Sequence, residues 1–190
     1  MKLWLVTALL AQALRAEAPE RPQIRLGEEA PAFELTTLEG DKVSGASLRG
    51  APAVLFFAAT WCSYSKRVSK AVQKIHKEYQ GKGVRVLLVN ILEARGEVEA
   101  AWRKKRKLAC PIAHDPDGAV ARAFAPPADV LPETRREDVM PSAVVLLDAG
   151  GRIRHFNEPT ENPGLVDWKL EALRRKLDGL LAAPPKPPGR

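Results

Sequence analysis

Apolar positions recur along the chain with two different periods, and these periods predict strands and helices in alternation. Residues 53–58 form an uninterrupted apolar run of strand length, which is typical of a strand buried on both faces. From Val68 onward, apolar residues recur at spacings of three and four until Gly81 and Gly83, which predicts an amphipathic helix of about four turns. A second apolar strand is predicted at residues 84–91.

The remaining pattern extends this alternation through most of the chain. Residues 32–44 alternate around a turn at 39–41 and predict a hairpin. The elements expected after residue 91 are a helix at 96–107, a strand at 111–113, a helix at 119–124, strands at 142–147 and 153–156, and a helix at 165–181 whose apolar face carries Leu170, Leu173, Leu177 and Leu180. Strands that alternate with helices predict a parallel α/β sheet with right-handed crossovers.

The ends of the chain predict an exported protein with one domain. Lys2 and a short apolar stretch at residues 3–10 are typical of a signal peptide, with A-x-A cleavage sites that end at Ala13 and Ala18. This stretch is too short to span a bilayer, so we expect no stable membrane insertion after cleavage. A buried N-terminal helix is the alternative. We therefore expect a signal peptide at 1–18, a linker at 19–30, a domain at 31–182 and a disordered tail at 183–190, in a periplasmic or extracellular protein.

The charge of the chain permits acidic partners without demonstrating one. The formal net charge is +7, and the predicted signal segment contributes +1 of it, from Lys2 and Arg15 against Glu17, which leaves +6. The densest basic run is residues 103–107, RKKRK. We interpret this run as a solvated helix face and expect no nucleic-acid partner, because no aromatic residues interleave with it and an exported protein rarely meets nucleic acid.

Cys62 lies where the apolar strand at 53–58 passes into the following helix. A helix N-terminus presents unsatisfied N–H groups and a partial positive charge, which stabilise an anion by up to about 2 kcal/mol. This field lowers the pKa of a thiol from about 8.5 to about 7, and Lys66 and Arg67 add further positive charge. We therefore expect a nucleophilic thiolate at Cys62; a buried, inert cysteine is the alternative.

The segment around this cysteine, FFAATWCSYSK, resembles the active-site segment of the thioredoxin superfamily. The branch it resembles is the extracytoplasmic TlpA/ResA-like one (redoxin, AhpC/TSA-like), in which W-C-x-x-C opens the first long helix; here the second cysteine is replaced by Ser65. The phrase APAFELTTLEGDKVSGASLRG is similar to the segment that precedes the central strand, and the resemblance extends from about Gly27 to Arg154. It implies a thioredoxin-like fold, with a central mixed sheet flanked by helices, an N-terminal hairpin and an extra helix–strand insertion.

The same resemblance implies roles for further residues. Pro141 matches the position of a cis proline opposite the active cysteine, and Met140 before it would offer its backbone to a client chain. Trp61 and Tyr64 would shape the client groove, and Ser65 would donate a hydrogen bond to the thiolate. Each residue also has a structural alternative. Pro141 would simply begin a strand, and Ser65 would be a residue favoured at a helix start. Trp61 and Tyr64 would be core or partly exposed aromatic residues.

Residues 125–139, which are rich in proline and charge, form a longer connection than a compact domain usually has. The family resemblance implies a shorter link, so we interpret them as an insertion, either a functional loop or a tolerated surface excursion.

Cys110 is predicted to be a core thiol that does not resolve Cys62. It precedes its strand, whereas Cys62 follows its own, so a parallel sheet places the two at opposite edges, too far apart for the roughly 7 Å that a disulfide allows between Cα atoms. His114 lies about 13 Å further along the strand, too far to share an ion with Cys110. With three histidines and no paired C-x-x-C spacing, we expect neither a metal nor a cofactor.

Three functional hypotheses follow. The first is a monothiol thiol–disulfide oxidoreductase, whose partners are client proteins with cysteines or disulfides and an external thiol reductant. The second is a catalytically degenerate thioredoxin-fold binding module. The third is a peroxiredoxin-like peroxidase, which Ala59 and Leu55 argue against, because peroxiredoxins keep Thr three residues before the reactive cysteine and Pro four residues before that Thr.

Overall fold

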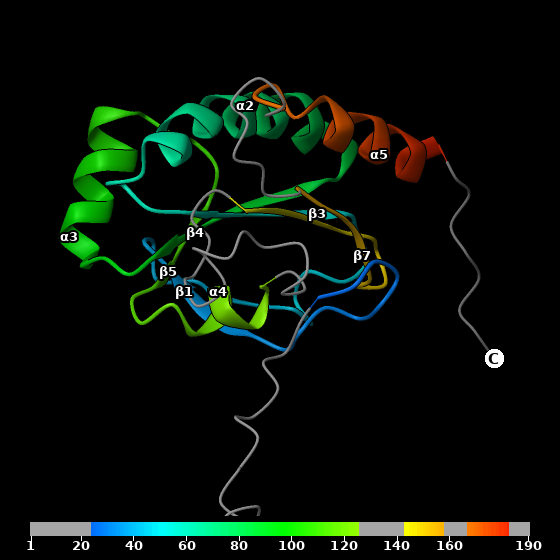
Figure 1. The fold of residues 1–190 in the computed structure, drawn as a ribbon, viewed down its shortest axis with the longest axis horizontal. Helices are drawn as coiled ribbons and strands as arrows, with labels where there is room; N and C mark the ends of the chain where they lie inside the picture. Colours follow the sequence, from blue (N-terminus) through cyan, green and yellow to red (C-terminus); the bar gives the residue numbers. More distant parts are fainter. Residues whose placement is uncertain (1–23, 126–142, 158–166, 183–190) are drawn as a thin grey trace, which may run out of the picture.

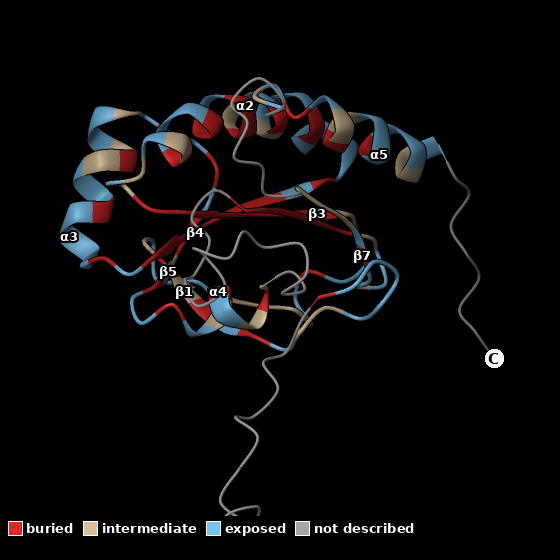
Figure 2. Cartoon of the chain, in the orientation of Figure 1, coloured by how far each residue is buried: buried red, intermediate tan, exposed pale blue. Residues whose placement is uncertain are grey.

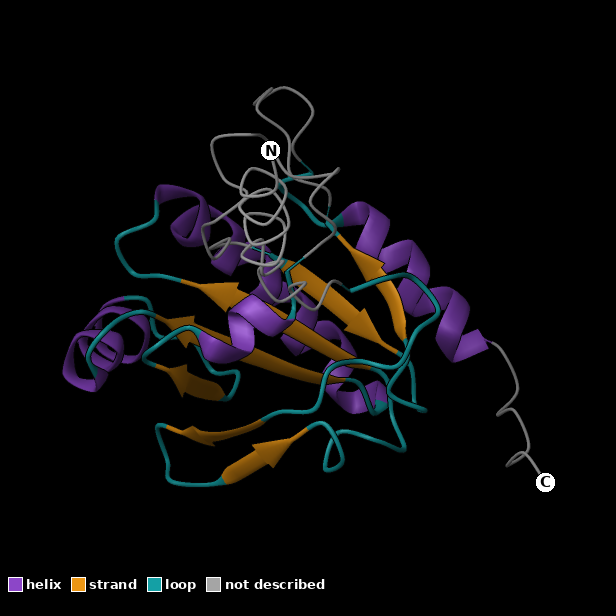
Figure 3. Ribbon diagram, turned by 60° about the horizontal axis from the view of Figure 1, so that its bottom comes forward, coloured by secondary structure: helices purple, strands orange, loops and turns teal. Residues whose placement is uncertain are grey.

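The computed structural model describes residues 24–125, 143–157 and 167–182, which form one sheet with helices on both faces (Figures 1 and 3). The strands are β1 (Glu34–Thr37), β2 (Lys42–Ser44), β3 (Ala53–Ala58), β4 (Arg85–Ile91), β5 (Ile112–Asp115), β6 (Val144–Leu147) and β7 (Ile153–Phe156). The α-helices are α2 (Ser63–Tyr79), α3 (Arg95–Val98), α4 (Ala119–Ala123) and α5 (Glu171–Ala182), joined by a 3₁₀ turn η1 (Gln80–Lys82) and a π-helix η2 (Glu99–Lys105).

The sheet is mixed, as predicted. Its strand order is β2-β1-β5-β4-β3-β6-β7, with β3, β4 and β5 parallel and the outer pairings antiparallel. The β1–β2 hairpin is the expected N-terminal hairpin, and η2 with β5 supplies the extra helix and strand between β4 and α4. Because β3, β4 and β5 run in the same direction, the loops that follow them emerge at one edge of the sheet.

The core lies in two layers, one on each face of the sheet. Helices α2 and α5 cover one face, and α4 covers part of the other (Figure 1). All six residues of β3 are buried, which explains its uninterrupted apolar run (Figure 2). Val54 and Phe56 pack into the layer under α2 and α5, whereas Leu55 and Phe57 pack into the opposite layer, as the alternation of side chains along a strand requires.

The helix predicted at 96–107 is present as two consecutive helical segments of different type. Only Arg95–Val98 is α-helical, and Glu99–Lys105 continues as a π-helix. Val98 and Trp102 are both fully buried against the sheet. The apolar spacing does not distinguish the two helix types, since either one presents this pair to the core.

The last helix begins later than its apolar pattern predicts. Leu170 has φ 55°, in the left-handed region, so α5 starts only at Glu171. The carboxylate of Asp167 accepts from the N–H groups of Glu171 and Ala172, at 2.9 and 2.8 Å, and caps the helix. The predicted apolar face is confirmed: Leu170, Leu173 and Leu177 are buried, and Leu180 packs against the same cluster.

The second half of the predicted linker packs against the domain. Ile24 is buried, and its N–H donates to the carbonyl of Ala125 at 3.0 Å. Gly27 N–H donates to Ile153 O at 2.8 Å, and Ile153 N–H donates to Glu28 O at 2.9 Å. The predicted signal peptide, the first part of the linker, nearly all of the 125–139 loop, Met140, Pro141 and the tail at 183–190 lie outside the described residues. No helix in the described part of the chain is long and apolar enough to cross a membrane.

Candidate active site

Cys62 is the N-cap residue of α2. Its backbone is extended (φ −77°, ψ 122°), and its sulfur accepts a hydrogen bond from the N–H of Ser65 at 3.5 Å. The first turn of α2 contains no acidic residue, so no carboxylate there offsets the partial positive charge of the helix end. The Cys62 side chain is partly buried against the core layer opposite α2 and α5. The sequence-based placement of a thiol at a helix N-terminus is therefore confirmed.

Ser65 occupies the position of the missing second cysteine and is fully buried. Its hydroxyl oxygen accepts from the N–H of Ala59 at 3.2 Å, which joins the end of β3 to the first turn of α2. Its backbone N–H is the group that contacts the Cys62 sulfur. Donation by the Ser65 hydroxyl to that sulfur stays a prediction.

The two aromatic residues predicted to shape the client groove have different surroundings. Trp61 is 58% exposed, directly before Cys62. Tyr64 is half-buried, and its ring lies 4.9 Å from that of Trp168, which also receives the Arg67 guanidinium at 3.9 Å from its ring centroid. Tyr64 therefore joins the start of α2 to the segment before α5, whereas Trp61 is accessible to solvent. The predicted contacts of Met140 and Pro141 lie outside the described residues.

A buried polar network supports the loop that carries Cys62. The Glu93 carboxylate accepts from Thr60 N–H at 2.5 Å, from the Thr60 hydroxyl, and from the Asn90 side-chain amide at 3.0 Å. Asn90 in turn accepts from the Trp102 indole N–H at 2.5 Å. Sequence analysis missed this network; the signal was a polar Asn90 inside an otherwise apolar strand, followed closely by an acidic residue. The network fixes Thr60, two residues before the thiol, to β4 and η2.

Leu92 follows β4 at the same edge of the sheet as the Cys62 loop. Its φ is 58°, a left-handed conformation that costs a non-glycine residue roughly 1–2 kcal/mol. The side chain is nevertheless 43% exposed. Trp61 and Leu92 thus present apolar surface on neighbouring loops at the active-site edge.

Cys110 is the buried core thiol that the sequence predicted. It lies in the layer under α2 and α5, whereas Cys62 packs against the opposite layer, and the two are not joined by a disulfide. Burial raises the pKa of the Cys110 thiol to about 11, against a smaller lowering effect from the Arg103 charge. Cys110 is therefore protonated at neutral pH and unable to act on Cys62 across the sheet.

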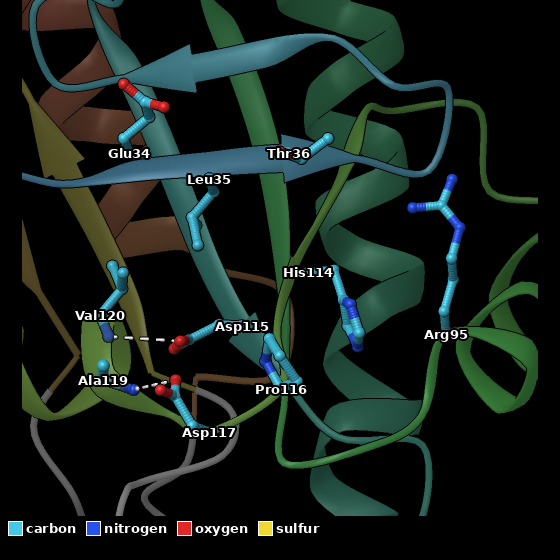
Figure 4. Close-up of a pocket in the computed structure, with 10 residues that line it drawn as sticks. All are labelled: Glu34, Leu35, Thr36, Arg95, His114, Asp115, Pro116, Asp117, Ala119 and Val120. Carbon is cyan, nitrogen blue, oxygen red and sulfur yellow. Dashed lines mark hydrogen bonds between the residues drawn. The ribbon is translucent and has the colours of Figure 1, made fainter.

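A separate shallow cavity of about 470 Å³ lies between β1, β5 and α4 (Figure 4). Two of its carboxylates bind backbone: Asp115 accepts from Val120 and Ala121 N–H at 3.3 and 2.9 Å, and Asp117 accepts from Ala119 N–H at 3.1 Å. These groups hold the start of α4. Across the described ranges, no cluster of three or more His, Cys, Asp or Glu side chains is arranged to hold a metal ion.

A mixed sheet with a cysteine opening the helix after its central strand defines a thioredoxin-like domain. A sequence profile of the AhpC/TSA family matches residues 26–156, and the chain belongs to that family. It is similar to the thiol-disulfide oxidoreductase ResA of Geobacillus thermodenitrificans, with 27% identity over 155 residues that cover 82% of each chain. The TlpA/ResA-like resemblance is thereby confirmed.

Solved structures give the same fold. A thiol:disulfide interchange protein of the thioredoxin family from Chlorobium tepidum superimposes with a TM-score of 0.60 at 20% identity, over 86% of this chain and 99% of that one. A secreted disulfide oxidoreductase from Mycobacterium tuberculosis, homologous to E. coli DsbE, superimposes with a TM-score of 0.58 at 22% identity, over 78% of this chain and 96% of that one.

Proposed function

We propose that the chain is an extracytoplasmic monothiol thiol–disulfide oxidoreductase that acts through Cys62. The observation that carries this proposal is the pair formed by Cys62 at the helix N-cap and the buried Ser65, whose backbone N–H donates to the Cys62 sulfur. Cys62 lies at the positive end of a helix, where a thiolate is stabilised and can act as a nucleophile. Ser65 stands where the resolving cysteine of a C-x-x-C motif would stand, and it has no sulfur. The names of the curated relatives, thiol-disulfide oxidoreductases, agree with this chemistry.

The reaction follows from that pair. The Cys62 thiolate attacks one sulfur of a client disulfide, a mixed disulfide forms, and the other client sulfur leaves as a thiolate that takes a proton. Ser65 offers no sulfur, and Cys110 is buried on the other side of the sheet. Release therefore requires an external thiolate or a second client thiolate, which attacks the mixed disulfide and becomes oxidised in place of Cys62.

The pH dependence of iodoacetamide alkylation tests the nucleophile. Because Cys110 is buried and its pKa is about 11, labelling of the folded protein near neutral pH reports Cys62 alone. We expect half-maximal reactivity near pH 7 or below, since the helix N-terminus stabilises the thiolate. A midpoint above about 8.5, or no labelling before denaturation, would remove the proposed activity.

The second candidate, a binding module that holds clients without turnover, is favoured by the same Ser65 observation, because an adduct without a resolving thiol is long-lived. Steady-state turnover of a disulfide substrate in the presence of a thiol reductant separates the two. An oxidoreductase turns over many times per Cys62, whereas a binding module stops after one.

A further inference from the structure

Beside the thiol lies a group of cations that form no ion pairs with the residues that the structure describes. On α2, Lys66, Arg67 and Lys70 are exposed within the first two turns after Cys62. At the end of η2, Lys105, Arg106 and Lys107 continue the basic run. We call these six residues the basic cluster.

The two halves of the basic cluster are in direct contact. The Arg106 guanidinium donates to the carbonyl of Lys66 at 2.8 Å and to the Ser69 hydroxyl at 3.4 Å, and it lies 5.7 Å from the centroid of the Trp102 ring. The Lys66 N–H donates to the carbonyl of Cys62 at 3.1 Å, so Arg106 is anchored one helical turn from the active thiol. The end of η2 is thus positioned beside the start of α2.

Within the described residues, no carboxylate neutralises the charge of the basic cluster. The run at 103–107 divides into two parts: Arg103 pairs with Glu39 and Lys104 pairs with Glu99, whereas none of the six cluster residues has a carboxylate partner among the described ion pairs. Glu93 is buried and its carboxylate accepts from Thr60 and Asn90, so it does not form an ion pair with the basic cluster. Clustered charge of one sign steers an oppositely charged partner and raises its association rate 10- to 1,000-fold.

We propose that the basic cluster binds an acidic segment of the client that flanks the client's reacting cysteine. This inference rests on the proposed function and names the substrate class for it. When a client sulfur bonds to Cys62, each client residue further along the chain lies at most about 3.5 Å further from the thiol. The residues that flank the client cysteine are therefore close enough to contact the basic cluster. An extended peptide is favoured over a flat anionic membrane, because a membrane seated on the cluster would cover the adjacent Cys62 and Trp61.

Synthetic peptides test the proposal. Three pentapeptides, Glu-Glu-Cys-Glu-Glu, Gln-Gln-Cys-Gln-Gln and Lys-Lys-Cys-Lys-Lys, are prepared as 2-thiopyridyl disulfides. Attack by the Cys62 thiolate forms the mixed disulfide and releases 2-thiopyridone, whose absorbance gives the second-order rate constant. At about 0.1 M ionic strength we expect the acidic peptide to react about 10-fold faster than the neutral one, with the preference lost at about 1 M salt.

The matched variants are compared by the ratio of the acidic to the neutral rate, in which any change in the reactivity of Cys62 itself cancels. The double variant Lys66→Glu/Lys70→Glu should reduce the ratio of acidic to neutral rates to about 1 or below. The control Lys74→Glu/Lys77→Glu makes the same charge change on the same helix, but Lys74 is about 18 Å from Cys62 along the axis, against about 6 Å for Lys66, and the Debye length is about 10 Å. It should change the ratio by less than about twofold. Lys105→Glu/Lys107→Glu, on the other element, should also lower the ratio.

Each outcome is informative. If no peptide reacts, the proposed function fails. If all three peptides react at equal rates, or if the control lowers the ratio as much as the Lys66/Lys70 variant, the function stands and the acidic-client proposal is overturned. If the peptides react equally while vesicles of anionic phospholipid sediment the protein through the same lysines, the cluster is a lipid-binding surface and the proposal is likewise overturned.

Discussion

Removal of the Glu93 carboxylate tests the network that supports the active-site loop. Glu93→Ala deletes the acceptor of Thr60 N–H and of the Asn90 amide, together with the acceptor of the Thr60 hydroxyl. A buried donor left without a partner costs about 1–3 kcal/mol. The Thr60 hydroxyl can rotate to another acceptor, so two buried donors, Thr60 N–H and the Asn90 amide, are left without a partner. The expected loss of unfolding free energy is about 3 kcal/mol, and any water that enters the space reduces this loss.

Two further variants separate the contribution of the network from that of the charge. Glu93→Gln keeps one carbonyl acceptor for Thr60 N–H and Asn90, so we expect it to lose about 1 kcal/mol. Glu97→Ala removes an exposed carboxylate on α3 and should change stability by no more than about 0.5 kcal/mol.

Urea unfolding followed by far-UV circular dichroism gives the stabilities, and the iodoacetamide rate of Cys62 at pH 7 gives the effect on the loop. Glu93→Ala should change this rate, because Thr60 lies two residues before the thiol. A Glu93→Ala variant as stable as the wild type, with an unchanged alkylation rate, would refute the reasoning.

The remaining predictions concern three other sites. Leu92→Gly should raise the unfolding free energy by up to about 1 kcal/mol, because glycine adopts the left-handed backbone without strain; a loss of more than 1 kcal/mol in urea unfolding would mean that contacts of the leucine side chain outweigh the strain. Burial, with a smaller effect from the Arg103 charge, lowers the pKa of His76 below 6.5, so the folded state disfavours its protonated form and stability should fall as pH decreases through 6.5 toward the lower folded-state pKa. His76→Gln should lose less stability than the wild type between pH 7.5 and 5.5. Equal losses would show that the pH dependence does not come from His76. Ser65→Cys places a second sulfur one helical turn from Cys62 and should raise insulin-reduction activity; no increase would contradict the active-site assignment.

Those elements whose residues contact the core with a regular period were predictable from the sequence. Strand β3 has the predicted bounds, because every one of its side chains is buried and the apolar run ends where burial ends. Cys62 was placed at the helix start because the period of apolar positions changes around it.

The rest depends on contacts between segments distant in sequence. The bonds of Glu93 to Thr60 and of Trp102 to Asn90 join three separate segments of the chain, and the sequence marks Asn90 and Glu93 as unusual without identifying their partners. The left-handed φ of Leu170 ends an apolar period that otherwise predicts a longer helix. The pairing of Arg103 with Glu39 likewise appears only when η2 packs beside the turn between β1 and β2.

The lifetime of the mixed disulfide is the most direct test of the central claim that Cys62 reacts and has no resolving thiol. The protein is treated with the neutral peptide disulfide, excess reagent is removed, and intact mass is followed over time without reductant. We predict one peptide adduct per chain, located on Cys62, that persists until glutathione is added, whereas the Ser65→Cys variant expels the peptide and forms an internal disulfide. Spontaneous loss of the peptide from the wild type with formation of a Cys62–Cys110 disulfide, or an adduct on Cys110 alone, would contradict the account.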